Sequence, residues 1–394
     1  MEHPRRHTIA MGLVTALVGF TSSFAVVLAG LRGVGATPEQ AASGLAILCI
    51  TQALGMLWLT WRYRAPLTLA WSTPGAALLA SQGAVAGGWP AAVGAFLVVG
   101  VLIVATGLVR PLGRLIGMIP PTIAQAMLAG ILFPLCLAPF ASLADQPWLV
   151  GALILVWILM QRLAARWATP VTFGVALVIM IAATARSGGA ALTAPALALT
   201  APALTWAGVL GIAVPLYVVT MASQNVPGVA VLKAAGYETP WKETMLVTGA
   251  GTLASAGFGG HAINLAAITA ALPASPESHP EPQRRWVATA TAGWAYLGIA
   301  VVAATLTALV DAAPAGLLES VAGLALLGTF ATSASGAMTE ARDRVPAAIT
   351  LLLAASGVAI VGIGSAFWAL LVGLAVRRIL QPRAAAVPAP AERG

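Results

Sequence analysis

Long apolar segments separated by short polar turns recur along the whole 394-residue chain. A helix needs about 20 mostly apolar residues to cross the hydrocarbon core of a bilayer, and twelve segments of between 12 and 25 residues are the candidates for such helices. They cover residues 8–31, 38–61, 89–109, 120–140, 148–161, 170–185, 204–224, 240–258, 286–310, 314–338, 345–361 and 365–376. The pattern predicts an all-α membrane protein.

Two further apolar segments, 66–82 and 259–272, are interrupted by small and polar residues, one in each half of the chain. The interruptions read Trp71-Ser72-Thr73-Pro74-Gly75 and Gly259-Gly260-His261-Ala262-Ile263-Asn264. Unwound backbone at membrane depth is tolerated only where protein or a watery cavity surrounds it. Interrupted helices at equivalent places in two repeats therefore indicate the central site of a transporter. With these two segments the number of predicted membrane elements is fourteen.

An internal repeat supports this division. The triplet Thr21-Ser22-Ser23 at the end of the first span has a counterpart, Ser223-Gln224-Asn225, 202 residues later. In both copies a Thr-Pro pair, Thr37-Pro38 or Thr239-Pro240, is expected to start the next span as N-cap and first helical residue. Each half holds seven elements, and because seven is odd the two repeats are inverted. We expect repeats at 1–186 and 204–380, a linker at 187–203 and a disordered cytoplasmic tail at 381–394.

Composition and charge fit this topology. The chain is 59% hydrophobic and 8% charged, whereas a soluble domain is roughly 25% charged. A net charge of +8 would suggest nucleic acid in a soluble protein, but eighteen of the twenty Lys and Arg residues fall on one side of the predicted membrane. Only Arg32 and Arg186 fall on the other side. Basic loops stay in the cytoplasm, so we expect cytoplasmic termini, a lipid bilayer as the surroundings and no nucleic-acid partner.

The two interruptions are candidate anion sites. Thr73 suits an N-cap and Pro74 a first helical position, which predicts a helix that begins inside the membrane after an extended stretch at 67–71. In the second segment, Gly259-Gly260 break the chain and we expect a helix from His261 to Leu272. Two helix N-termini that meet near the midplane would bind an anion. For either segment alone, an ordinary kinked span packed by Gly and Pro is the alternative.

Other polar residues within the spans have two interpretations each. Ser22, Ser23, Gln224 and Asn225 either line the site or form hydrogen bonds between helices. His261 and Glu319 are ionisable groups at membrane depth and are therefore candidates for function. The alternatives are a neutral imidazole bonded to backbone for His261 and a carboxylate that reaches external water for Glu319. The sequence has neither a disulfide framework nor a zinc-site spacing, and no cofactor is expected.

These segments resemble the BenE family of benzoate/proton symporters. The resemblance rests on residues 70–79 (AWSTPGAALL), 220–228 (TMASQNVPG) and 261–270 (HAINLAAITA). The family is similar in fold to the uracil permease UraA, which implies a core domain of elements one to four and eight to eleven and a gate domain of the remaining elements. It also implies an elevator-like movement of the core and a place in the bacterial inner membrane.

One departure from the nucleobase carriers bears on the substrate. Those carriers resemble this chain in fold but place acidic side chains in the eighth and tenth elements, where this chain has amides and a histidine. Amides and helix N-termini favour a carboxylate. We expect an aromatic carboxylate such as benzoate to contact Ser22, Ser23, Ser72, Thr73, Gly75, Gln224, Asn225, Gly260, His261 and Asn264.

A proton is the expected partner of the anion. Import of one negative charge against an interior-negative potential costs about 2.3 kcal/mol per 100 mV, and co-transport of one proton removes this cost. His261 is the first candidate for the proton carrier and Glu319 the second. The alternatives are a carrier of the same fold for a nucleobase or another monocarboxylate, and an anion channel. An enzyme is least supported because the sequence lacks a phosphate loop, a zinc motif and a nucleophile elbow. A homodimer through the gate domains stays open.

Overall fold

The computed structural model describes residues 2–186 and 196–380. A helix covers most of each of the twelve predicted spans, and among the described residues eight helices are long and apolar enough to cross a membrane. The all-α membrane fold is therefore confirmed, while the count of fourteen membrane elements stays a prediction. The expected linker is described only from residue 196, and the expected tail at 381–394 lies outside the described residues.

The two halves contain similar series of elements. The first half has α1 (Glu2–Thr21), α2 (Phe24–Gly33), α3 (Pro38–Tyr63), β1 (Leu69–Trp71), α4 (Thr73–Gln82), α5 (Gly88–Leu108), α6 (Arg110–Gly117), α7 (Pro121–Asp145), α8 (Pro147–Ala164) and α9 (Ala168–Arg186). The second half has α10 (Trp206–Gly208), α11 (Val214–Thr220), α12 (Val226–Ala234), α13 (Trp241–Ala256), β2 (Ile263–Leu265), α14 (Ala271–Ala274), α15 (Trp286–Asp311), α16 (Leu317–Ala337), α17 (Arg344–Ala355) and α18 (Ser365–Leu380).

Of the two predicted Thr-Pro helix starts, one is confirmed. Thr37 caps α3, and its side chain accepts a hydrogen bond from Gln40 N at 3.3 Å. The start at Thr239-Pro240 is wrong by one residue, because Pro240 has a ψ of 83° and the helix begins at Trp241. The Thr239 hydroxyl is buried without a hydrogen-bond partner among the described residues, so it does not act as a cap.

The helix that contains Gln224 and Asn225 runs past its predicted end at residue 224 and continues through α12 to Ala234. It includes two π-helical turns, Val209–Ala213 and Met221–Asn225. Each turn lies just ahead of a proline, Pro215 or Pro227. A proline cannot donate the backbone bond to the residue four positions earlier, and the wider π turn accommodates this loss. Such turns are frequent at functional sites.

The two interrupted segments meet as a pair of short antiparallel strands. In β1 and β2, Leu69 is paired with Leu265, Ala70 with Asn264 and Trp71 with Ile263. Hydrogen bonds from Ser72 N to Ala262 O at 3.0 Å and from Ala266 N to Thr68 O at 2.9 Å extend the pair. The strands are almost wholly buried, so each half satisfies the backbone groups that the other would leave unpaired at membrane depth. Antiparallel strands are also what inverted repeats would give.

This pairing corrects the expectation of a helix from His261 to Leu272. Residues 263–265 are extended, and only Ala271–Ala274 form a helix. The predicted N-cap at Thr73 is also wrong by one residue, since Ser72 is the N-cap and Thr73 the first residue of α4. The structure therefore has one long half-helix, α4, that begins at the strand pair, opposite a turn followed by a single helical turn.

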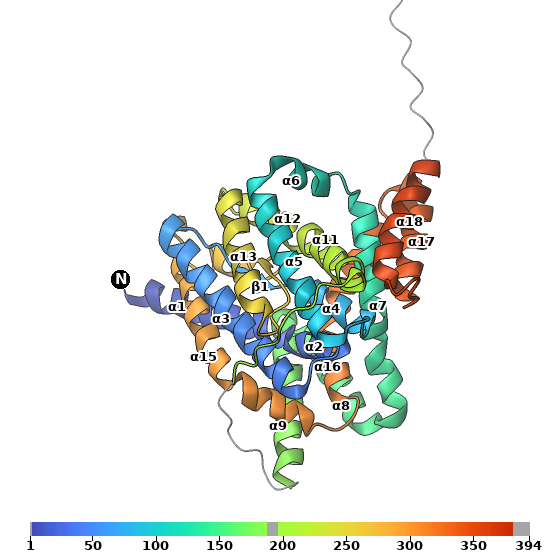
Figure 1. Cartoon of the computed structure of the whole chain (residues 1–394). Coiled ribbons are helices and arrows are strands. Elements are labelled where there is room, and N and C mark those ends of the chain that lie inside the picture. Colours follow the sequence, from blue (N-terminus) through green and yellow to red (C-terminus); the bar gives the residue numbers. More distant parts are fainter. Residues whose placement is uncertain (1, 187–195, 381–394) are drawn as a thin grey trace, which may run out of the picture.

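The helices pack into two groups, which we call the core and the gate. The core comprises α1–α5 and α10–α15 with both strands, in which α3 packs against α15, α5 against α13 and α2 against α4. The gate comprises α7–α9 and α16–α18, in which α7 packs against α16 and α17. Figure 1 shows α7, α17 and α18 at one edge of the molecule and α1, α3 and α15 at the opposite edge. This is the expected division into core and gate domains.

Candidate functional site

A cavity of about 610 Å³ lies where the core meets the gate, beside the strand pair. Its core wall consists of Val18, Gly19, Ser22, Ser23, Ala70, Trp71, Thr73, Pro74, Ser223, Gln224, Pro227, Ala266, Ala267, Ile268, Thr269 and Tyr296. Its gate wall consists of Gln125, Leu128, Leu132, Ala165, Arg166, Thr169, Pro170, Ala325, Leu326, Gly328, Thr329, Thr332 and Ser333. Because both groups of helices contribute, a movement of the core against the gate would remodel the cavity.

The start of α4 forms one part of the core wall. Ser72 is fully buried, and its hydroxyl accepts hydrogen bonds from Gly75 N at 3.1 Å and from Thr220 Oγ1 at 2.7 Å. A Cβ atom on Gly75 would lie 2.3 Å from Leu216 Cδ1 and 2.7 Å from Ser72 Oγ, so a larger residue would force both side chains to move. Ser72 and Gly75 thus fix the helix end from behind, while Thr73 and Pro74 face the cavity.

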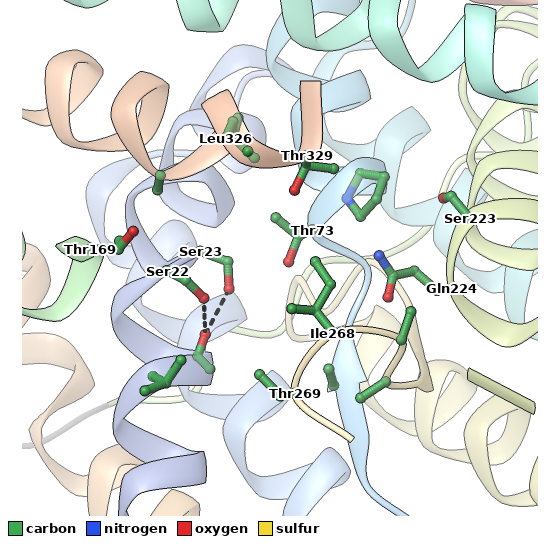
Figure 2. A pocket seen from close by; sticks show the side chains of 18 of the residues that line it. Ser22, Ser23, Thr73, Thr169, Ser223, Gln224, Ile268, Thr269, Leu326 and Thr329 are labelled. Atoms are coloured by element: carbon green, nitrogen blue, oxygen red, sulfur yellow. Dashed lines mark hydrogen bonds between the residues drawn. The ribbon is translucent and has the colours of Figure 1, made fainter. Parts of the chain in front are cut away.

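The segment that follows β2 forms the opposite part of the core wall. Ala266 to Thr269 line the cavity, and the Ile268 side chain is 66% exposed. Figure 2 shows Ile268 between Thr73 and Gln224. Asn225 is fully buried behind it and accepts a hydrogen bond from Leu265 N at 2.9 Å through its side-chain oxygen. Asn225 therefore positions β2, whereas its neighbour Gln224 reaches the cavity.

The break between α1 and α2 positions a tryptophan. The Ser23 hydroxyl accepts a hydrogen bond from Trp71 Nε1 at 2.8 Å and donates one to Gly19 O at 2.9 Å. The Ser22 hydroxyl donates to the same carbonyl at 3.1 Å (Figure 2). The Trp71 ring is 2% exposed and packs edge-on against Phe20 and Tyr296. An aromatic cluster therefore lies directly beneath the polar start of α4.

Three of the predicted substrate residues on the second interruption do not line the cavity. A Cβ atom on Gly260 would lie 2.3 Å from Ser255 Oγ, so this glycine allows close packing against α13. His261 is fully buried next to the Phe96 ring, and neither of its ring nitrogens has a hydrogen-bond partner among the described residues. Asn264 is also fully buried, and its amide pairs with Ser72 N and Leu265 O.

Glu319, the second proton candidate, lies apart from the cavity. It is exposed in the first turn of α16 and lines a separate hollow with Asp145 and Ser142 at the end of α7. The structure therefore brings Ser22, Ser23, Thr73 and Gln224 together around one cavity, with Ser72, Gly75 and Asn225 behind its wall. It does not bring Glu319 to them. Among the described residues there is no group of three His, Cys, Asp or Glu side chains that could hold a metal ion.

The gate wall was not predicted from the sequence. Thr329, Thr332 and Ser333 follow one another at helical spacing on α16, and this periodicity of hydroxyl groups in an apolar helix is a signal that could have identified them. Arg166 also lines the cavity. In the sequence it is one of many basic residues at the ends of spans, so the charge asymmetry of the loops already accounted for it.

The cavity has the chemistry of a site for a small amphiphilic anion. A helix N-terminus carries roughly half a positive charge, and α4 presents its N-terminus next to the Thr73 hydroxyl and the Gln224 amide. Leu128, Leu326 and Ile268 provide apolar surface around these groups. None of the described residues that line the cavity is Asp or Glu, so nothing in its wall would repel a carboxylate.

Comparisons with known proteins agree on a transporter. The family model described as BenE, benzoate membrane transport protein, matches residues 3–379. The inner membrane protein YdcO of Escherichia coli (strain K12) is 39% identical over 369 residues, which are 93% of this chain and 94% of that protein. A protein of Acinetobacter baylyi named benzoate membrane transport protein is 30% identical over 391 residues, or 96% of each chain.

Solved structures show the same fold at low identity. The transmembrane domain of a cyanobacterial bicarbonate transporter, BicA, matches with a TM-score of 0.58 and 15% identity, over 95% of this chain and 98% of that one. The murine anion transporter Slc26a9 in its inward-facing state matches with a TM-score of 0.64 and 13% identity, over 95% of this chain and 68% of that one. At these identities the likeness concerns the fold alone.

Proposed function

The chain belongs to the BenE family of benzoate membrane transport proteins, and from this premise we propose that it imports benzoate or a similar aromatic carboxylate together with protons. It is a multi-pass membrane protein and a membrane transporter. The observation that carries the proposed substrate class is the N-terminus of α4, which begins at a cavity whose described lining contains no acidic side chain.

The carboxylate binds at the start of α4. Thr73 offers a backbone amide and a hydroxyl there, and Gln224 offers an amide from the π turn. Charge-assisted hydrogen bonds to a carboxylate are roughly twice as strong as neutral ones. Because Ser72 and Asn225 already hold α4 and β2 in place, these donors do not have to be ordered when the anion arrives, which favours binding.

The aromatic ring lies on the apolar side of the cavity. Ile268 on the core and Leu128 and Leu326 on the gate face the same space. Because the Ile268 side chain is largely exposed, covering it with an aromatic ring removes apolar surface from water and favours binding. Ser22, Ser23 and the aromatic rings of Trp71 and Tyr296 form the wall of the cavity on the side of α1. A ligand with one charged end and one apolar end matches these two surfaces.

His261 is the proposed proton carrier. It adjoins Ala262, whose carbonyl oxygen accepts a hydrogen bond from Ser72 N at the start of α4, so the imidazole and the carboxylate site lie on neighbouring backbone segments. A proton on a fully buried imidazole without a partner is costly, and the arrival of an anion nearby offsets this cost. Glu319 is the weaker candidate because it is exposed on the gate, which would not travel with the substrate.

The proposed transport cycle is an elevator-like movement of the core against the gate. The cavity reaches the surface at the turn Ala165–Trp167, where Arg166 is 59% exposed. This turn is on the side of the N-terminus, because His7 of α1 and Arg166 both contact Glu277. By the asymmetry of basic residues this is the cytoplasmic side of the inner membrane, so the described conformation would be open to the cytoplasm.

Competition in proteoliposomes tests the substrate class. The initial rate of labelled benzoate uptake is measured with unlabelled benzoate, salicylate or uracil as competitor. We expect saturable uptake that both aromatic carboxylates inhibit and that uracil leaves unchanged. Inhibition by uracil would instead indicate a nucleobase carrier, and a rate that rises linearly with concentration above that of protein-free vesicles would indicate a channel.

A further inference from the structure

Arg166 is the one charged side chain among the described residues that line the cavity. It belongs to the short turn Ala165–Trp167, which joins α8 to α9 on the gate. The guanidinium is always ionised and has a planar fork of donors that fits a carboxylate. A permanent positive charge thus lies at the point where the cavity meets solvent.

Arg166 forms only a loose ion pair with Glu277. Arg166 Nη1 lies 3.9 Å from Glu277 Oε2, and the two side chains are 59% and 74% exposed. A separation of 3.9 Å is too long for a hydrogen bond, whereas a well-formed pair of these groups has two bonds of about 2.7–2.9 Å. Such a pair is readily exchanged for another carboxylate.

Glu277 is presented by a firmly held segment of the core. His7 Nε2 donates to Glu277 O at 2.8 Å, and Thr8 Oγ1 donates to Ser278 O at 2.9 Å. The buried Arg285 side chain donates to Ala274 O at 2.9 Å and to His279 O at 2.8 Å. The backbone around Glu277 is therefore fixed to α1 and α15, so the ion pair with Arg166 joins the core to the gate at the rim of the cavity.

We propose that Arg166 binds the substrate carboxylate at the cytoplasmic mouth of the cavity, where the imported anion leaves the inward-open carrier, and that Glu277 competes with the anion for the guanidinium and occupies it in the empty carrier. This rests on the proposed function, because it requires an anionic substrate. Arg166 is then a specificity-determining residue. It raises the local concentration of anions at the opening and gives a neutral ring compound of the same size no advantage.

The two charges have opposite expected effects on affinity. An exposed ion pair contributes up to about 1 kcal/mol, which corresponds to about fivefold in a binding constant. We therefore expect Arg166→Gln to raise the KM for benzoate about threefold to fivefold, and Glu277→Gln to lower it about twofold. The double variant should resemble Arg166→Gln, since Glu277 acts only through Arg166. Added salt should raise the KM of the unmodified protein but not that of Arg166→Gln.

The test uses the full chain in proteoliposomes, with labelled benzoate supplied on the side of the N-terminus. Arg162→Gln is the matched control, because Arg162 is an exposed arginine one turn earlier on α8 that does not line the cavity. If the unmodified protein transports benzoate while Arg166→Gln and Arg162→Gln have the same KM and salt response, the role of Arg166 is wrong. If Glu277→Gln also raises the KM, the displacement is wrong, and a lowered KM cannot result from misfolding. If the unmodified protein does not transport benzoate at all, the proposed function fails instead.

Discussion

Ser72 fixes the start of α4 although its side chain does not reach the cavity. Its hydroxyl is fully buried and accepts hydrogen bonds from Gly75 N and Thr220 Oγ1. The first bond satisfies one of the amides that a helix start leaves free, and the second connects α4 to α11. The direction of the amide at Thr73, and so the proposed carboxylate site, depends in part on this side chain.

We predict that Ser72→Ala lowers the stability of the protein by about 1 kcal/mol, the usual contribution of an N-cap, and raises the KM for benzoate. Thermal unfolding in detergent and initial uptake rates measure the two effects. Ser81→Ala is the control, because the Ser81 hydroxyl donates to Leu78 O in the same helix without capping it. An unchanged KM in Ser72→Ala would show that the start of α4 does not bind the substrate.

His261 allows a separate test of proton coupling. Glutamine is similar in size and polarity to histidine but cannot carry a proton. We predict that His261→Gln still exchanges labelled for unlabelled benzoate across the membrane but no longer accumulates it under a pH gradient. His279→Asn is the control, since asparagine keeps an acceptor for the hydrogen bond that His279 Nδ1 receives from Glu281 N. Accumulation by His261→Gln would assign the proton to another group.

The sequence revealed which residues are polar at membrane depth but not which way they point. Ser22, Ser23, Thr73 and Gln224 line the cavity, and their contact with a substrate stays a prediction. Within the π turn Met221–Asn225, Gln224 faces the cavity while Asn225 binds β2, and a local pattern does not distinguish such neighbours. The surroundings of residues 259–261 come partly from α3 and α5, which are distant in sequence.

At the scale of elements, the local sequence pattern predicted one strand of the strand pair and missed the other. The extended stretch before α4 was expected, but β2 was expected to be helical. The β2 backbone amides bind side chains outside their own segment, Ile263 N to Thr252 Oγ1 at 3.1 Å and Leu265 N to Asn225 Oδ1 at 2.9 Å. Helix propensity depends on the local sequence and takes no account of these hydrogen-bond partners. Tertiary context therefore overrides it.

We predict that Thr252→Val destabilises the protein by about 1–3 kcal/mol, because valine has the same shape but leaves the buried Ile263 amide without an acceptor. Thr252→Ser keeps the hydroxyl and should cost less. Thermal unfolding of the two variants, followed in detergent, gives the comparison. Equal stabilities would mean that this hydrogen bond does not hold β2 in place.

At the scale of the whole molecule, aromatic rings join the core to the gate beyond the cavity. Phe24 at the start of α2 packs edge-on against Phe173 of α9, with ring centroids 5.3 Å apart and both side chains buried. Phe173 follows the lining residues Thr169 and Pro170 along α9. An elevator-like movement must separate these rings, whereas the contact of Phe20 with Phe24 at 5.1 Å lies within the core.

Cross-linking therefore distinguishes a moving core from a fixed one. In a background with Cys49 and Cys136 replaced by alanine, we predict that a cleavable thiol cross-linker between the cysteines of Phe24→Cys/Phe173→Cys stops benzoate exchange, and that reduction restores it. The same reagent on Phe20→Cys/Phe24→Cys should leave the exchange rate as it was before cross-linking. Persistent exchange in a fully cross-linked core–gate pair would exclude the elevator.

Much of the global architecture could be predicted from the sequence, because hydropathy, the one-sided distribution of Arg and Lys, and the repeat constrain the topology independently. A helix was found at every predicted span. The side on which the cavity opens could not be predicted, because it depends on how the gate wall of α7, α9 and α16 packs against the core. Spacing within a span does not encode such packing between spans.

Labelled benzoate accumulation in proteoliposomes, with the pH gradient and the membrane potential imposed separately, tests the central claim most directly. Protein-free vesicles under the same gradients measure passive entry of the protonated acid. If one proton accompanies each anion, the net charge moved is zero, and we predict saturable accumulation above this background under the pH gradient alone and none under the potential alone. Absence of protein-dependent uptake under either gradient would contradict the account.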